Sequence, residues 1–136
     1  MKRILRITLV SFLCLALLTQ HPVVRSSASD QNSILNLYDA EGRMGLHQDK
    51  DEGERSLAAG LPVVSISLGD TARFLFGGLK RKDAVESRLL ESGDAFVFGG
   101  PARLRYHGVS RILPGTAPRE LNLEGRFNLT FRQYDL

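Results

Sequence analysis

Two metal-binding side chains, His47 and Asp49, are separated by a single residue at the end of a predicted strand. Alternate residues of a strand point to the same face, so the imidazole and the carboxylate can approach one centre. A second histidine would complete a set of two imidazoles and one carboxylate, which occupies one face of an iron(II) ion and leaves three positions open. His21 lies in the N-terminal segment, so His107 is the candidate for the third ligand.

Both the His47 and Asp49 pair and the third candidate, His107, have a plain structural alternative to metal binding. A His-x-Asp pair arises by chance or on a protein surface more often than it ligates a metal. A histidine in a strand, such as His107, is commonly half-buried and hydrogen-bonded to the backbone. The metal site therefore needs support from residues elsewhere in the chain.

The C-terminal segment 126–132 alternates between polar and apolar residues. Arg126, Asn128 and Arg132 share one face, and Phe127, Leu129 and Phe131 share the other. Two arginines projecting from an apolar strand are costly to bury unless anions pair with them. A dicarboxylate fits, because guanidinium binds carboxylate through two hydrogen bonds. The alternative is a polar face exposed to solvent.

The elements that must position these residues have a period of two rather than 3.6. The pattern predicts about nine short strands and no substantial helix, with at most a turn or two over 52–59. The strands are expected at 33–39, 44–49, 63–68, 72–76, 88–91, 95–98, 104–109, 120–124 and 126–133. Pairs of glycines at 77–78 and 99–100 mark turns. The prediction is a mainly β fold, an antiparallel double-stranded β-helix or jelly roll.

The N-terminal residues 1–29 differ from the rest of the chain. Lys2, Arg3 and Arg6 precede a twelve-residue apolar run at 7–18, and small residues at 26–29 offer a cleavage point. That order is typical of a secretory signal peptide, and the run is short for a membrane span. The alternative is a leader of accidental composition, such as a truncated gene produces. We therefore divide the 136 residues into this hydrophobic leader and one domain at 30–136.

The charge of the chain belongs to that leader. The whole chain has a net charge of +3, but residues 30–136 contain 14 basic and 15 acidic residues and have a net charge of −1. Bulk electrostatics therefore does not indicate a nucleic-acid partner. A single cysteine excludes an intramolecular disulfide framework and a cysteine-cluster zinc site.

Several blocks of the sequence, taken in order, resemble a known family. They are Asn36-Leu37-Tyr38-Asp39, the run from Leu46 to Glu52, Phe76-Gly77-Gly78-Leu79-Lys80-Arg81, Gly93-Asp94, Tyr106-His107-Gly108 and the run from Arg126 to Arg132. Together they are similar to the catalytic core of AlkB, a family of iron(II)- and 2-oxoglutarate-dependent dioxygenases that repair N-alkylated bases in DNA and RNA. The resemblance runs from about residue 33 to residue 133.

The resemblance implies a role for each of ten residues. His47, Asp49 and His107 would bind iron(II). Arg126 would pair with the distal carboxylate of 2-oxoglutarate and Arg132 would lie near its metal-binding end, with Asn36, Tyr38 and Asn128 hydrogen-bonding around the cosubstrate. Asp51 and Arg81 match positions that contact the alkylated base, although each also reads as an ordinary charged surface residue.

The implied reaction consumes O₂ and 2-oxoglutarate, oxidises the alkyl group on the base, and releases formaldehyde and succinate. The partner would be an alkylated base in single-stranded or flipped-out DNA or RNA, because a stacked base cannot reach the metal. We expect a monomer with no protein partner.

The family carries an N-terminal lid that clasps the nucleotide, and residues 1–29 stand in its place. The expectation is therefore a core without that lid, located in the cytoplasm if it serves the family role, or exported if the leader is a working signal. Two other functions stay open: a catalytically impaired fragment, and an exported jelly-roll oxygenase acting on a small molecule.

Overall fold

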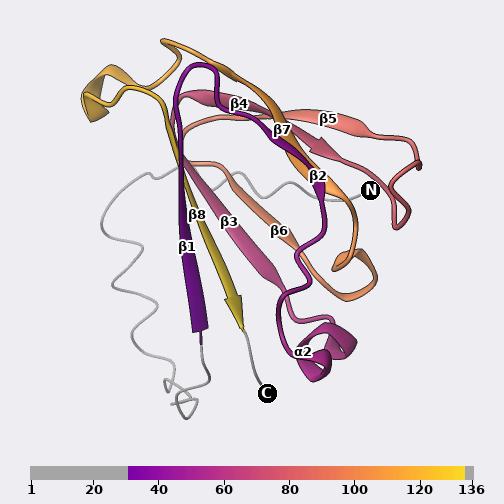
Figure 1. The fold of residues 1–136 in the computed structure, drawn as a ribbon. Helices are drawn as coiled ribbons and strands as arrows, with labels where there is room; N and C mark the ends of the chain where they lie inside the picture. Colours follow the sequence, from indigo (N-terminus) through magenta and orange to yellow (C-terminus); the bar gives the residue numbers. More distant parts are fainter. Residues whose placement is uncertain (1–30, 134–136) are drawn as a thin grey trace.

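The structure is a computed structural model that describes residues 31–133, and short strands dominate this part of the chain (Figure 1). The strands are β1 (Gln31–Tyr38), β2 (Met44–His47), β3 (Val63–Gly69), β4 (Thr71–Phe76), β5 (Glu86–Leu90), β6 (Ala95–Phe98), β7 (His107–Leu113) and β8 (Arg126–Gln133). The helical elements are α2 (Glu54–Ala59) and the 3₁₀ turns η2 (Gly100–Ala102) and η3 (Arg119–Leu121). Within residues 31–133, no helix is long and apolar enough to span a membrane.

The eight strands form two four-stranded antiparallel sheets. The major sheet has the strand order β1-β8-β3-β6, and the minor sheet has the order β2-β7-β4-β5. The chain crosses between the sheets repeatedly, so that strands far apart in sequence, such as β1 and β8, pair along their whole length. Two sheets packed over one core confirm the predicted jelly roll.

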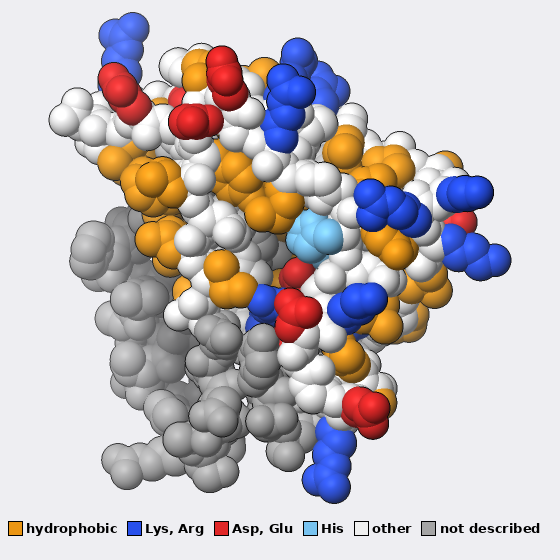
Figure 2. Space-filling view, in the orientation of Figure 1, with side chains coloured by type: hydrophobic (Ala, Val, Ile, Leu, Met, Phe, Trp, Pro, Cys, Tyr) orange, Lys and Arg blue, Asp and Glu red, His pale blue; other side chains and the backbone are white. Residues whose placement is uncertain are grey.

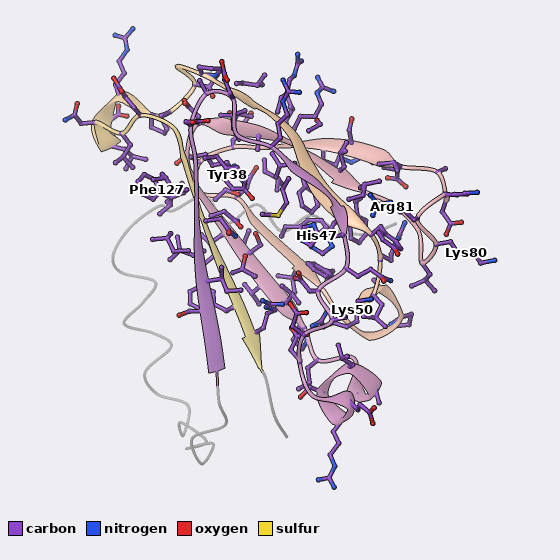
Figure 3. All side chains as sticks on the ribbon, in the orientation of Figure 1. Tyr38, His47, Lys50, Lys80, Arg81 and Phe127 are labelled. Carbon is purple, nitrogen blue, oxygen red and sulfur yellow. The ribbon has the colours of Figure 1, made fainter. Side chains whose placement is uncertain are left out.

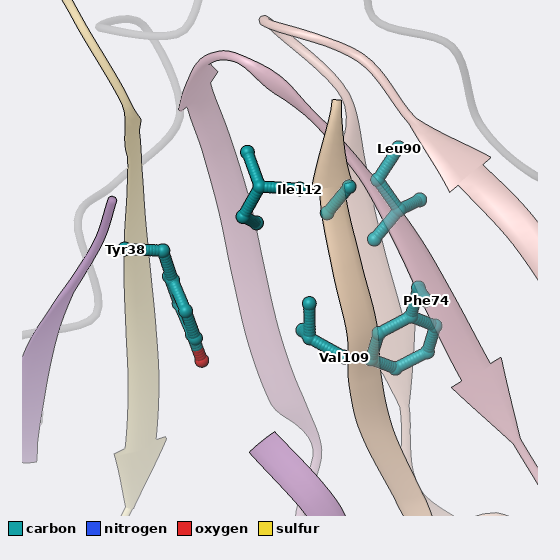
Figure 4. Packing of buried hydrophobic residues seen from close by; sticks show 6 residues of the cluster. Tyr38, Phe74, Leu90, Val109 and Ile112 are labelled. Carbon is teal, nitrogen blue, oxygen red and sulfur yellow. The ribbon is translucent and has the colours of Figure 1, made fainter. Parts of the chain in front are cut away.

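The hydrophobic core lies between the sheets. It is built from buried residues of both sheets, and Met44, Phe76 and Phe96 pack against its edge; the buried members are Tyr38, Ala72, Phe74, Leu90, Val109 and Ile112 (Figure 4). The rings of Phe74 and Phe96 lie with their centroids 4.7 Å apart, which joins β4 of the minor sheet to β6 of the major sheet. This contact holds the two sheets at a fixed separation beside the candidate site.

The two faces of the major sheet have opposite polarity. The face toward the minor sheet carries Arg126, Asn128 and Arg132 of β8, and the two arginines are buried. The face away from it carries the apolar residues of the same strand, and Phe131 is 42% exposed. The polar face of β8 is therefore not the solvent-facing surface that the sequence left open as an alternative.

Two predicted strands are wrong. Residues 120–124 form no strand, because the chain turns through η3 after Pro118 and Asn122 adopts the left-handed conformation with φ 46°. The alternating Leu121 and Leu123 that suggested a strand are both solvent-exposed. The strand expected at 104–109 is shifted, because the Tyr106 amide donates to the carbonyl of Gly78 in the turn after β4, and β7 instead runs from His107 to Leu113.

The remaining boundaries agree with the prediction to within three residues. The helical turn expected over 52–59 is present as α2, which ends at Gly60 in the left-handed conformation. The predicted leader at 1–29 lies outside the described residues.

Candidate active site

The two histidines lie opposite each other on paired strands. His47 is the last residue of β2 and His107 is the first residue of β7, and they are direct partners in the antiparallel register. Their ring centroids are 4.4 Å apart. Gly108 permits this approach, because a Cβ atom there would lie 2.6 Å from the Met44 carbonyl oxygen. A larger residue at this position would push β2 away from β7 and separate the histidines.

Both imidazoles are oriented by the backbone. The Nδ1 atoms of His47 and His107 lie 2.9 and 3.0 Å from the carbonyl oxygens of Gly45 and Arg105. The Nε2 atoms consequently face Asp49, at 3.6 and 3.7 Å from its two carboxylate oxygens. A carbonyl that fixes the far ring nitrogen in this way is the usual support of a metal-binding histidine.

This donor set fits a divalent metal ion. One ligand atom from each of the three residues lies within 4.8 Å of the others. The Nε2 to carboxylate distances are too long for good hydrogen bonds, but an ion bonded at about 2 Å to each donor joins atoms separated by about 3 to 4 Å. Two imidazoles and one carboxylate on one side of a cavity are the ligand set expected for non-haem iron(II). His47, Asp49 and His107 are thus brought together as predicted.

The environment favours the protonation state that metal binding requires at two of the three ligands, His107 and Asp49. Burial lowers the pKa of His107, which keeps its imidazole neutral. Burial would raise the pKa of Asp49, but contact with His47 and the positive charge of Arg132 hold that pKa below its usual value. The Asp49 carboxylate raises the pKa of His47.

Arg126 is a buried cation that faces the cavity. Its side chain is only 1% exposed, and it donates to the carbonyl oxygen of Leu90 at 3.1 Å and to the Ser67 hydroxyl at 2.7 Å. Within the described part of the chain, no carboxylate lies within salt-bridge distance, and the Nε atom has no hydrogen-bond partner. A buried guanidinium without a counter-ion is expensive unless an anionic ligand joins it. The site therefore fits a dicarboxylate such as 2-oxoglutarate.

Sequence reasoning missed a buried charge cluster next to the metal ligands. The carboxylate of Glu52 lies 2.6 Å from Arg103 and 3.2 Å from Arg132, and all three side chains are at most 5% exposed. Arg103 also donates to the backbone oxygen of Asp49 at 2.6 Å, and Arg132 lies 3.7 Å from the Asp49 carboxylate. The cluster thereby fixes both the loop that carries Asp49 and the orientation of Arg132.

The sequence offered only a faint indication of that cluster. Glu52 follows Asp49 by three residues and Arg103 precedes His107 by four, so each flanks a metal ligand. No periodicity distinguishes a buried glutamate in a loop from an exposed one, so the sequence alone does not assign Glu52 to the site.

The predicted cosubstrate residues line one cavity with the metal ligands. The cavity measures about 140 Å³, and its walls include Asn36, Tyr38 and Asn128 as well as both arginines of β8. Tyr38 donates weakly to the Met44 sulfur at 3.6 Å, and the Asn128 amide donates to the Ser65 hydroxyl at 2.6 Å. Their predicted contacts with 2-oxoglutarate stay predictions.

The two predicted substrate residues lie outside the cavity. Arg81 is exposed, donates to the Leu46 carbonyl at 2.9 Å, and lies 5.9 Å from the centroid of the Tyr106 ring. These contacts place it beside the exposed edge of His47, and Figure 2 shows a histidine at the surface with Lys and Arg side chains close by. Figure 3 labels Lys50, Lys80 and Arg81 on this side of the molecule. Asp51 is exposed and is not among the residues that line the cavity.

Comparison with known proteins defines the class. A family model described as the 2OG-Fe(II) oxygenase superfamily matches residues 10–132, so the chain belongs to that superfamily. The match begins within the predicted leader.

More specific relatives place the core in the AlkB family. The chain is 49% identical over 100 residues to "Alpha-ketoglutarate-dependent dioxygenase AlkB" of Escherichia coli K12, which covers 74% of this chain and 44% of that protein. It is 54% identical over 106 residues to "DNA N(6)-methyladenine demethylase ALKBH1C" of Arabidopsis thaliana, covering 74% and 23%. The solved structure of OsALKBH1 superposes with a TM-score of 0.71 and 55% identity, covering 74% and 48%. This chain thus spans less than half the length of these relatives.

Proposed function

We propose that this chain catalyses iron(II)- and 2-oxoglutarate-dependent oxidative demethylation of N-alkylated bases in DNA or RNA, with release of formaldehyde and succinate. The observation that carries the proposal is the combination, in one cavity, of three metal donors and a buried arginine that has no counter-ion within residues 31–133. A metal site alone would suit many reactions, whereas the arginine selects an anionic cosubstrate.

The metal and the cosubstrate supply the oxidising chemistry when bound, and the protein's own groups supply orientation. His47, Asp49 and His107 would hold iron(II). Arg126, which is buried in the lining of the cavity, would neutralise the distal carboxylate of 2-oxoglutarate. Arg132, held by Glu52, would present a positive charge beside Asp49.

Aromatic rings form an apolar wall beside His107. The Phe98 ring lies 4.8 Å from the His107 ring, and the Phe74 ring lies 6.1 Å from it. Such a wall strengthens the electrostatic interactions within the cavity. The exposed edge of His47, with Arg81 beside it, is the side from which the alkyl group would approach.

The target base would have to leave the helical stack or begin in a single strand. The names of the relatives support a nucleic-acid substrate, since one is a DNA N(6)-methyladenine demethylase. The basic side chains near His47 would contact phosphates, which is the sequence-independent part of nucleic-acid binding.

The test is turnover of a single-stranded oligonucleotide that contains one N-methylated base, with iron(II), 2-oxoglutarate and O₂. We expect formaldehyde and succinate in equal amounts, and neither product with His47→Ala. A protein that binds iron and 2-oxoglutarate but releases no formaldehyde from any methylated oligonucleotide would refute the proposal. Succinate released with a small molecule instead would favour the alternative oxygenase.

A further inference from the structure

The outer face of the major sheet is an apolar surface, and the described residues leave much of it exposed. Cross-strand pairing aligns its side chains in three rows: Leu37, Phe127 and Leu68; Leu35, Leu129, Ile66 and Ala95; and Phe131, Val64 and Val97. None of these ten residues is charged. Figure 3 shows Phe127 pointing away from the sheet on the side opposite Tyr38.

The degree of exposure is unusual for side chains of this type. Leu35, Leu37 and Val97 are 62%, 67% and 58% exposed, and Phe131 is 42% exposed. Single exposed apolar residues are normal on protein surfaces, but a contiguous apolar patch marks a surface that another chain segment or molecule covers. The absence of charge in the three rows argues for an apolar occupant rather than a nucleic acid.

We propose that the apolar run at 7–18 of this chain covers the outer face of the major sheet and is therefore a part of the folded domain. This segment contains twelve residues, of which only Thr8 and Ser11 are polar. It is as free of charge as the rows it would cover. A segment of this composition needs an apolar surface to bury it.

The connection can reach the whole face. Residues 19–30 separate the run from β1, an edge strand of the same sheet. Twelve residues extend to about 40 Å at most, whereas an eight-residue strand is about 27 Å long and four strands are about 14 Å across. The run itself would span about 18 Å as a helix, enough to cross the four strands, which are about 14 Å across.

The family comparison gives an independent reason. The superfamily model aligns from residue 10, so the alignment includes most of the apolar run together with the β core. A cleavable leader is not part of the domain it exports. If the run is part of the folded domain, residues 1–29 are retained. Experiment can distinguish their retention from their removal as a cleaved leader.

The sole native cysteine, Cys14, lies within the run and supplies a probe for disulfide trapping. In the full chain, Leu37→Cys and Val97→Cys each place a thiol on the outer face. Leu89→Cys is the matched control, because Leu89 is 48% exposed on β5 of the minor sheet. Positions 89 and 97 also fall in the same tryptic peptide, 89–103, so their cross-links are directly comparable by mass spectrometry.

After mild oxidation with diamide, we expect disulfides between the 7–25 peptide and the outer-face thiols, at least five-fold more abundant than those formed by Leu89→Cys. Equal yields for all three variants would overturn the proposal. So would a dominant disulfide between two copies of the Leu37→Cys chain, which would show a second molecule on the face. A purified chain from its own cells that lacks the 7–25 peptide would also overturn it.

Discussion

The two faces of β8 carry opposite kinds of side chain within one strand. On the inner face, Arg126 and Arg132 are buried, although burial is costly for charged groups. On the outer face, Phe131 is exposed, although it would contribute stability if it were covered. Folding stability alone would favour the reverse arrangement. The inner face is therefore organised for ligands, and the outer face for a covering segment.

The comparison shows how a polar active site is placed inside a small β domain. Ser65 and Ser67 of β3 hydrogen-bond Asn128 and Arg126 across the strand pair, so the polar residues of the inner face support one another. The metal ligands come from the opposite sheet and the loop after β2. The site thus lies where the polar face of one sheet meets the two histidine-bearing strands of the other.

The largest effect is expected from the metal ligands. Asp49→Ala should lower turnover by at least about 1,000-fold, because loss of the ion removes several kcal/mol of stabilisation of the transition state. Stoichiometric iron binding by equilibrium dialysis should be lost in parallel. Retention of full iron binding by this variant would contradict the assigned ligand set.

The buried cluster at Glu52 should matter most for stability. Glu52→Ala leaves Arg103 and Arg132 without their shared carboxylate and should lower the free energy of unfolding by about 3 to 5 kcal/mol. The exposed pair between Glu86 and Arg88 is the control, and Glu86→Ala should cost at most about 1 kcal/mol. Urea denaturation measures both. Equal losses for the two variants would show that burial of the cluster has no special effect.

Arg126→Met separates ligand binding from folding. A methionine of similar length removes the unpaired buried cation, so the melting temperature of the ligand-free protein should stay the same or rise. The KM for 2-oxoglutarate should rise at least about 30-fold, because a charge pair with the cosubstrate is lost. Phe131→Leu, on the other face of the strand, should leave this KM unchanged. A normal KM for 2-oxoglutarate in Arg126→Met would show that the cosubstrate binds elsewhere.

The smallest effect is expected at the mouth of the site. Arg81→Ala should raise the KM for the oligonucleotide by about five-fold, which corresponds to about 1 kcal/mol, and should not alter the KM for 2-oxoglutarate. Lys82→Ala, in the same turn, is the matched control. A change in both substrate constants would mean that Arg81 acts on the site through the Leu46 carbonyl rather than on the base.

Much of the fold followed from the period of two, because alternation specifies strands whose opposite faces differ in environment. The alternation could not show which face of β8 lies inside. Burying its arginines and exposing its apolar side chains are each unfavourable, so neither face is an obvious choice from sequence. The expected strand at 120–124 failed because the alternating leucines lack a partner strand. Pairing partners are set by the whole sheet, which local sequence does not encode.

The metal ligands were predictable because their residue types are few and the resemblance fixed their order. Glu52 and Arg103 were not, because a charged residue in a loop is buried only when the fold brings its counter-charge to it. The pairing of Arg132 with Glu52 joins residues 80 positions apart. No spacing in the sequence marks such a pair.

The most direct test of the account measures 2-oxoglutarate binding by the full chain under anaerobic conditions, with and without iron(II). We predict one molecule bound per chain in the presence of the metal, much weaker binding by His107→Ala and Arg126→Met, and unchanged binding by Phe131→Leu. Equal binding by the wild type and Arg126→Met would contradict the central claim that the inner face of the major sheet is built to hold this cosubstrate.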